Sequence, residues 1–169
     1  GAELEIFAPR DFVQQPKRWM DRLTRRAGDP DDMHIYTVAP NFALELAARY
    51  AAAEAPQEYD FSQVAAVIIG SESVTKPGVE AFVGAFGESG LDRTVLRPSY
   101  GLAEATLLVS TPQAGKTTEL PRFTSFDREQ LAAGTAAEVA EGQGVQFASN
   151  GQPVSWMRFA IVDPATKDE

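Results

Sequence analysis

The sequence VAAVIIG, from Val64 to Gly70, is the stretch that decides the fold. A continuous apolar run that ends at a glycine is typical of a central parallel strand, buried on both faces of its sheet. Helical patterns lie on both sides of this run. One helix is predicted from Asn41, as its capping residue, to about Ala53. The next opens at residues 73–77, and its inward face is expected to consist of Val79, Phe82, Val83 and Phe86.

Further strands are predicted at Ile35–Val38 and near Val95, so strands and helices alternate from Ile35 to Ser110. This order predicts an α/β fold with a doubly wound, mainly parallel sheet and flanking helices. Upstream, the spacing of Phe12, Trp19, Met20 and Leu23 predicts a helix that Pro16 starts.

The character of the sequence changes after Pro112, where Gly, Ala, Gln, Ser and Thr dominate. A short helix is predicted at residues 127–133 and a last strand at 155–162. We therefore expect an α/β subdomain over residues 1–112, an insertion or loop region over 113–153, and the start of a β-rich subdomain over 154–169. This loop-rich β segment at the C-terminal end completes the predicted fold.

Composition limits the classes of function. The chain has 169 residues, 44% of them hydrophobic, and a formal net charge of −9. The acidic balance argues against nucleic acid as the main partner. Because there are no cysteines, disulfides and thiolate metal sites are excluded. No apolar run reaches the length of a transmembrane segment, so a cytoplasmic protein is expected. Both ends are interpreted as cuts inside a longer enzyme.

The stretch PSYGLAEATL, from Pro98 to Leu107, carries the strongest functional signal. It follows an apolar run, so it is expected at the end of a buried strand. Gly101 allows the backbone to approach a ligand closely, Tyr100 offers a flat face, and Glu104 can bind Mg²⁺. An ordinary strand, turn and helix start with an incidental surface glutamate is the alternative. The segment GSES, Gly70–Ser73, ends the preceding strand and is expected to face the same pocket.

These motifs resemble those of adenylate-forming enzymes, specifically the fatty acyl-AMP ligase branch. The wider superfamily has threonine where Ala103 stands, whereas the acyl-AMP ligases share this alanine. The segments GSES and Thr37–Ala43 match further family motifs in the right order, although Ser73 replaces a usual proline. The resemblance extends from about residue 8 to residue 112, and residues 126–131 resemble the insertion that distinguishes acyl-AMP from acyl-CoA ligases. A surface loop without such a role remains the alternative for that insertion.

The resemblance implies ATP and Mg²⁺ as cofactors, a fatty acid as substrate, and an acyl carrier protein or polyketide synthase as partner. It assigns Glu104 to catalysis and metal binding, and Asn41 and Phe42 to the acyl pocket. The residues expected to bind the nucleotide are Gly70, Ser71, Glu72, Ser73, Ser99, Tyr100, Gly101, Leu102 and Ala103. Capping of a helix by Ser71 or Ser73 is a compatible structural role.

Several expected parts of such an enzyme are not found in the sequence. It contains no phosphate loop ending in Pro-Lys-Gly, no downstream ribose-binding aspartate and no catalytic lysine lid. We therefore expect the chain alone not to complete the reaction. An acyl-CoA ligase and a non-catalytic binding domain with a ligase-like core remain open.

Other conspicuous residues receive structural interpretations. His34 lacks a nearby nucleophile motif, and the acidic run at residues 29–32 is interpreted as a solvated turn. Trp19 and Trp156 are expected in the core. The basic cluster at residues 17–26 is interpreted as a solvated helix face, with docking of an acidic carrier protein as the alternative.

Overall fold

The computed structural model describes residues 3–54, 58–113 and 121–168. Its centre is a parallel sheet in the order β1-β2-β3, made of β1 (Ile35–Ala39), β2 (Val64–Ile69) and β3 (Leu96–Pro98). The mixed α/β architecture with a parallel sheet predicted from the sequence is confirmed, and the apolar run at residues 64–69 is its middle strand.

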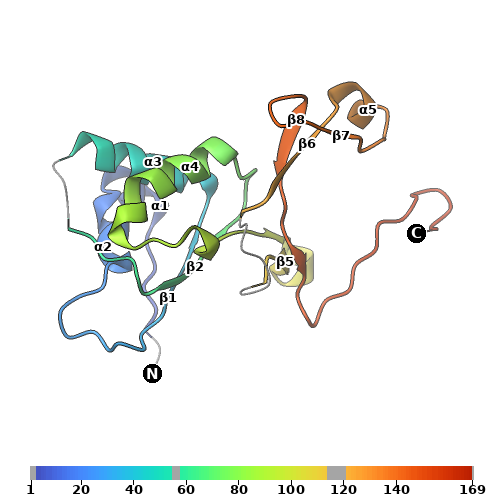
Figure 1. Ribbon diagram of the computed structural model, residues 1–169. Helices are drawn as coiled ribbons and strands as arrows, with labels where there is room; N and C mark the ends of the chain where they lie inside the picture. Colours follow the sequence, from blue (N-terminus) through green and yellow to red (C-terminus); the bar gives the residue numbers. More distant parts are fainter. Residues whose placement is uncertain (1–2, 55–57, 114–120, 169) are drawn as a thin grey trace.

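Two long helices connect these strands and pack against each other, α3 (Asn41–Ala53) and α4 (Lys76–Phe86). Figure 1 shows them side by side over the sheet, with the short helices α1 (Pro9–Gln14) and α2 (Lys17–Leu23) nearby. Trp19 donates its indole N–H to the Thr37 hydroxyl at 3.0 Å and packs on Phe82, so α2 lies against both β1 and α4. The core of the molecule lies between this helical layer and the sheet.

The opposite face of the sheet is open at β1. Side chains alternate between faces along a strand, and here Tyr36 and Val38 are 67% and 74% exposed while Ala39 is buried. A doubly wound fold needs helices on both faces, and the second helical layer is not seen in the part of the chain that the structure describes. The two helices predicted between the strands, α3 and α4, therefore cover the same face of the sheet.

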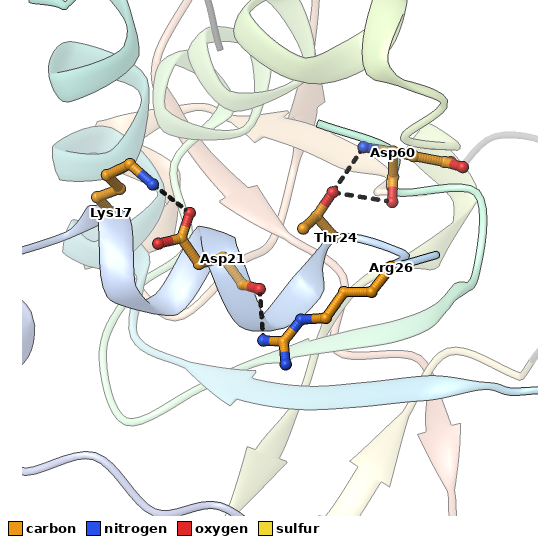
Figure 2. Close-up of polar contacts among 5 residues, drawn as sticks. All are labelled: Lys17, Asp21, Thr24, Arg26 and Asp60. Atoms are coloured by element: carbon orange, nitrogen blue, oxygen red, sulfur yellow. Dashed lines mark hydrogen bonds and ion pairs between the residues drawn. The ribbon is translucent and has the colours of Figure 1, made fainter. Parts of the chain in front are cut away.

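The basic residues in and after α2 form polar contacts with neighbouring groups (Figure 2). Lys17 pairs with Asp21 one turn later, and Arg26 donates to the Asp21 backbone carbonyl at 3.0 Å. The Thr24 hydroxyl accepts the Asp60 N–H at 2.7 Å, which joins the end of α2 to the segment before β2. Arg22 and Arg25 also have acidic partners. This pairing supports a solvated helix face.

The rest of the chain forms two small antiparallel sheets. One has the order β4-β5-β9, from β4 (Tyr100–Gly101), β5 (Leu108–Thr111) and β9 (Gln152–Pro153). The other has the order β7-β6-β8, from β6 (Phe123–Phe126), β7 (Glu138–Val139) and β8 (Val145–Ala148). The predicted short helix is confirmed as α5 (Arg128–Ala132), with Asp127 capping it by accepting the Gln130 N–H at 2.8 Å.

Short 3-10 turns complete the described elements, η1 (Gly87–Ser89), η2 (Arg93–Val95) and η3 (Ala103–Ala105). The helix predicted to start at Pro16 is confirmed as α2, whose N-cap is Pro16. Phe12 lies in the separate helix α1, because the backbone leaves helical geometry at Gln15. The predicted strand at residues 155–162 is wrong, since that segment has no strand and Trp156 is 75% exposed rather than in the core. Among the described residues, no helix has both the length and the apolarity to cross a membrane.

Candidate functional site

The three parallel strands end in register at one edge of the sheet. Ala39 pairs with Ile69, and Ile69 pairs with Pro98, so the loops that follow begin side by side. Gly70 donates its N–H to the Ala39 carbonyl at 3.3 Å, and Ser99 donates its N–H to the Ile69 carbonyl at 2.8 Å. The segments that start at Asn41, Gly70 and Ser99, far apart in the sequence, therefore meet at the carboxyl edge of the sheet.

Gly70 permits the closest approach of two of these loops. A Cβ atom on Gly70 would lie 3.3 Å from the Ser99 carbonyl oxygen, which is tighter than most such contacts. Ser71 then adopts a left-handed conformation, with φ of 68°. A left-handed non-glycine residue costs energy and is often found in a binding or catalytic loop. The chain thus turns sharply as it leaves β2, with Ser71, Glu72 and Ser73 exposed.

Glu72 is not a free surface carboxylate. Its Oε1 accepts the backbone N–H of Phe42 at 2.6 Å, in the first turn of α3. A carboxylate is stabilised there by the unpaired N–H groups and the positive end of the helix dipole. The predicted capping by Ser71 or Ser73 is wrong for α4, because Thr75 is its cap and accepts the Gly78 N–H at 3.2 Å.

Asn41 was expected to cap α3, but the cap position is Pro40 and Asn41 is the first helical residue. Its side chain, in a residue that is 5% exposed, reaches across to the start of α4. The amide nitrogen donates to Glu45 at 2.9 Å and to the Thr75 hydroxyl at 3.3 Å, and the amide oxygen accepts the Thr75 N–H at 3.0 Å. Sequence reasoning missed Thr75, although a threonine two residues before Pro77 is a helix-start signal.

The third loop is held in a narrow turn. A Cβ on Gly101 would lie 1.8 Å from the Leu107 carbonyl oxygen, so only glycine fits where β4 meets the return strand β5. Thr106 has φ of 70°, a second left-handed non-glycine residue beside the candidate site. Ser99 and Thr111 hydroxyls lie 2.8 Å apart and fix the base of the turn. The suggested helix start is instead the single turn η3.

The exposed side chains of this loop are those that the sequence singled out. Tyr100 is half-exposed, Ala103 and Glu104 are exposed on η3, and Leu102 is partly covered. Phe42 is 42% exposed, and its ring centroid lies 6.2 Å from that of Phe12. The structure therefore presents the candidate tyrosine and glutamate to solvent on one loop, next to the strained loop at Ser71.

The loop at residues 99–104 has one carboxylate with which to bind a cation, that of Glu104. In the described ranges, no group of three acidic, histidine or cysteine side chains is close enough to hold a metal ion. Mg²⁺ is commonly bound by one or two carboxylates together with substrate phosphates and water. Glu104 fits that pattern for a metal that arrives with a nucleotide.

Two shallow hollows lie outside the three loops. One runs between α3 and α4 and is lined by four alanines together with Glu45, Arg49, Pro77 and Gly78. The other separates the start of α4 from the turn between β7 and β8, and Lys76 crosses it to pair with Glu141. The hydrogen bond to Glu141 raises the pKa of Lys76 above its ordinary value. Neither hollow is lined by residues 70–73 or 99–104.

Comparison of the sequence with known proteins gives consistent matches, although no family model matches the chain. It is 36% identical over 166 residues to the long-chain-fatty-acid–AMP ligase FadD28 of Mycobacterium tuberculosis, covering 98% of this chain and 27% of the relative. It is 37% identical over 166 residues to FadD26 of the same organism, covering 97% of this chain and 27% of the relative. The chain is homologous to a segment of the fatty acid–AMP ligases.

Solved structures agree with this relationship. The fatty acid AMP ligase from Legionella pneumophila superposes with a TM-score of 0.76 at 25% identity, over 94% of this chain and 26% of that one. A fatty acyl-adenylate ligase of L. pneumophila, in complex with acyl adenylate and pyrophosphate, gives 0.72 at 27% identity, again over 94% and 26%. The adenylation domain of a keto acid-selecting module gives 0.67 at 28% identity, over 86% and 27%.

The resemblance to fatty acid–AMP ligases seen in the sequence motifs is thereby confirmed, and it extends beyond residue 112 to nearly the whole chain. The chain spans about a quarter of the length of the curated relatives it matches, 27% in each case. The roles assigned to single residues are not tested by these matches and remain predictions.

Proposed function

We propose that the protein to which this chain belongs activates a fatty acid with ATP. The observation that carries the proposal is the meeting of three ligase-like loops at one edge of the parallel sheet, in a chain homologous to fatty acid–AMP ligases. In open α/β sheets, ligands bind at the carboxyl ends of the strands, where these loops lie. The fatty acid carboxylate oxygen attacks the α-phosphorus of ATP, the bond to the bridging oxygen breaks, and acyl-adenylate and pyrophosphate form.

In this proposal, each loop contacts a different part of the substrates. Tyr100 packs its ring on the adenine, while the backbone of Gly70–Ser73 and Ser99–Ala103 surrounds the nucleotide. Phe42 is exposed at the start of α3, next to the buried Asn41, and borders the acyl side. Glu104 supplies the carboxylate for Mg²⁺, which would neutralise charge on the phosphates as they react. The small side chain of Ala103 leaves the space beside the nucleotide open.

The acceptor of the acyl group is proposed to be the phosphopantetheine of an acyl carrier protein or polyketide synthase. The region of residues 113–153 then corresponds to the insertion of the acyl-AMP ligases, and residues 154–169 begin the following subdomain. Residues 123–148 support this division, because they form a sheet of their own that Lys76 ties to α4 through Glu141. A cytoplasmic location fits the use of ATP.

We also propose that the sheet is doubly wound in the whole protein. Tyr36 and Val38 leave apolar surface on the face opposite α3 and α4. Parallel sheets occur almost only with both faces covered. Helices from the remaining part of the polypeptide would provide that cover.

The test is an assay of the full-length protein with ATP, Mg²⁺ and fatty acids, in which acyl-adenylate and pyrophosphate are measured. We expect both products from the full-length protein and neither from the 169-residue chain alone. Glu104→Gln should lower kcat by about 100-fold, in the range found for the loss of one electrostatic contact to a transition state. The matched control is Glu88→Gln, an exposed glutamate of η1 that follows the end of α4 opposite to the loop at residues 70–73, which should leave kcat unchanged.

The assay also separates the alternatives. Adenylate formation followed by thioester formation on addition of coenzyme A would identify an acyl-CoA ligase. A full-length protein that folds but forms no acyl-adenylate with fatty acids of any length would identify a non-catalytic domain and refute the proposal.

A further inference from the structure

The starts of α3 and α4 are joined by a polar cluster in which Asn41 is buried, Glu45 is half-buried and Thr75 is exposed. Asn41 lies at its centre, with Thr75 and Glu45 as partners. The Thr75 hydroxyl lies 3.4 Å from the Glu45 carboxylate and accepts the Gly78 N–H. The cluster therefore joins one turn of each helix at the edge where the candidate loops begin.

Each polar atom of the Asn41 amide is bonded within this cluster, and three of the four hydrogen bonds that the amide can make are present. An asparagine amide has two N–H donors and an oxygen that can accept two hydrogen bonds. Both donors are directed to Glu45 and Thr75, and the oxygen accepts the Thr75 N–H. Since the residue is 5% exposed, removing the amide would leave the Thr75 N–H without its partner.

Gly78 gives independent support for a built cluster. A Cβ at this position would lie 2.9 Å from the Thr75 hydroxyl oxygen and 3.0 Å from both the Asn41 and Glu45 side-chain oxygens. A methyl group would displace all three polar groups. The glycine in the first turn of α4 therefore allows the two helices to approach closely enough for the side chains to bond.

A second contact also joins the loop after β2 to the start of α3. Glu72 accepts the Phe42 N–H at 2.6 Å, so the middle of the loop after β2 is fixed to α3. The end of that loop is fixed to α3 through Thr75 and Asn41. Ser71, with its left-handed backbone, lies just before both contacts. A strained conformation persists only where the surroundings hold it.

We infer that Asn41 is a positioning residue, which acts through Thr75 and together with the Glu72–Phe42 bond to hold residues 70–73 in the conformation that binds the nucleotide. This inference rests on the proposed function. It assigns Asn41 to the nucleotide side of the site rather than to direct contact with the acyl chain, because its polar atoms are already bonded and its side chain is buried.

The test uses steady-state kinetics of the full-length protein. Asn41→Ala should raise KM for ATP by about tenfold, as expected when a buried hydrogen-bond partner is lost and the loop must be ordered on binding. KM for the fatty acid should stay within about twofold. Asn150→Ala, at the exposed second asparagine of the chain, is the matched control and should change neither constant. A rise in KM for the fatty acid alone would overturn the inference and place Asn41 in the acyl pocket.

A second variant covers the case in which Asn41→Ala does not fold. Glu72 is exposed, so Glu72→Ala should fold and should also raise KM for ATP. Glu72→Gln retains an oxygen that can accept the Phe42 N–H, and it should raise that KM less than Glu72→Ala does. Equal effects of the two substitutions would contradict a role through this hydrogen bond.

Amide hydrogen exchange separates this inference from the proposed function. The Thr75 amide should exchange at least about tenfold faster in Asn41→Ala, and the Phe42 amide likewise in Glu72→Ala, because each loses its acceptor. If the wild-type protein forms no acyl-adenylate, the proposed function fails, while these exchange rates still report on the contacts. Unchanged exchange at Thr75 would overturn the positioning role of Asn41.

Discussion

The chain before Tyr100 and the chain after it are stabilised in different ways. All the buried side chains of the main core cluster lie between Phe12 and Leu96. Among the described residues from 100 onward, the buried hydrophobic side chains are Val109 and Val154. The first part therefore depends on burial of apolar surface, which is the largest favourable contribution to folding. The second part has little such surface.

Strand pairing and glycine turns hold the later part together instead. β6 pairs with both β7 and β8 through backbone hydrogen bonds. Gly144 has φ of 75°, and a Cβ there would lie 2.1 Å from the Phe126 carbonyl oxygen. Gly151 is similarly close to the backbone of Thr111 and Pro112. The candidate site lies at the boundary, because the loops at Asn41 and Gly70 belong to the first part and the loop that starts at Ser99 leads into the second.

The largest expected effect comes from the core of the first part. Phe82 has 0% exposure and packs against Trp19 and Phe86. Truncating a buried phenylalanine loses apolar burial and leaves a cavity, so Phe82→Ala should lower the free energy of unfolding by about 3–5 kcal/mol. Urea unfolding followed by circular dichroism measures this change.

The comparison supplies the matched control. Phe159 belongs to the later part and is 53% exposed, so Phe159→Ala should change the free energy of unfolding by at most about 0.5 kcal/mol. A similar loss of stability in both variants would show that Phe159 also packs in a core, contrary to its exposure in the structure.

Smaller effects are expected at two glycines, Gly101 at the boundary and Gly84 within α4. Gly101→Ala would place a methyl group against the Leu107 backbone and should destabilise the turn by about 1–3 kcal/mol. In the full-length protein it should also weaken ATP binding, measured by calorimetry. Gly84 is exposed within α4 with nothing near its Cβ, so Gly84→Ala should stabilise the helix by about 0.5–1 kcal/mol. Equal behaviour of the two variants would refute the close approach at Gly101.

The same division decides how far the sequence predicts the structure. In the first part, β2 was predicted to the residue and the start of α3 to within one residue, because an apolar run and a helical repeat are local patterns. The candidate loops at residues 70–73 and 99–104 were also placed correctly at one edge, since parallel strands direct their carboxyl ends to the same side. The binding roles of these residues remain predictions.

The failures depend on contacts between distant residues. Asparagine is a residue type that often caps helices, but the Asn41 side chain bonds to Thr75, 34 residues away. β5 was not predicted, because its partners β4 and β9 are very short. The segment 155–162 has apolar residues typical of a strand, yet it has no strand partner within the described part of the chain. Local patterns do not reveal which partner a strand or polar side chain will find.

The smallest expected effects are the lowered pKa values of two carboxyl groups, one in each part. Hydrogen bonds from Ser62, through its hydroxyl and its N–H, lower the pKa of Asp60 below its ordinary value. Backbone N–H groups of Thr166 and Ala165 do the same for Asp163. A lowered pKa means that each carboxylate stabilises its native turn above the ordinary pKa of about 3.9, and that this contribution is lost as the pH falls through the lower native value. Carboxyl ¹³C NMR should find both groups titrating below that ordinary value.

In the Phe82→Ala variant, the same two titrations test whether the later part of the chain keeps its local structure without the core of the first part. The Asp60 turn is held by contacts to Thr24 and Arg25, so it should be lost when urea unfolds the core of this variant, and the pKa of Asp60 should rise to its ordinary value. The Asp163 turn is closed by hydrogen bonds within residues 163–168. Its pKa should therefore stay low in the same variant. If both values rise together, the later part depends on the core of the first part for its local structure as well.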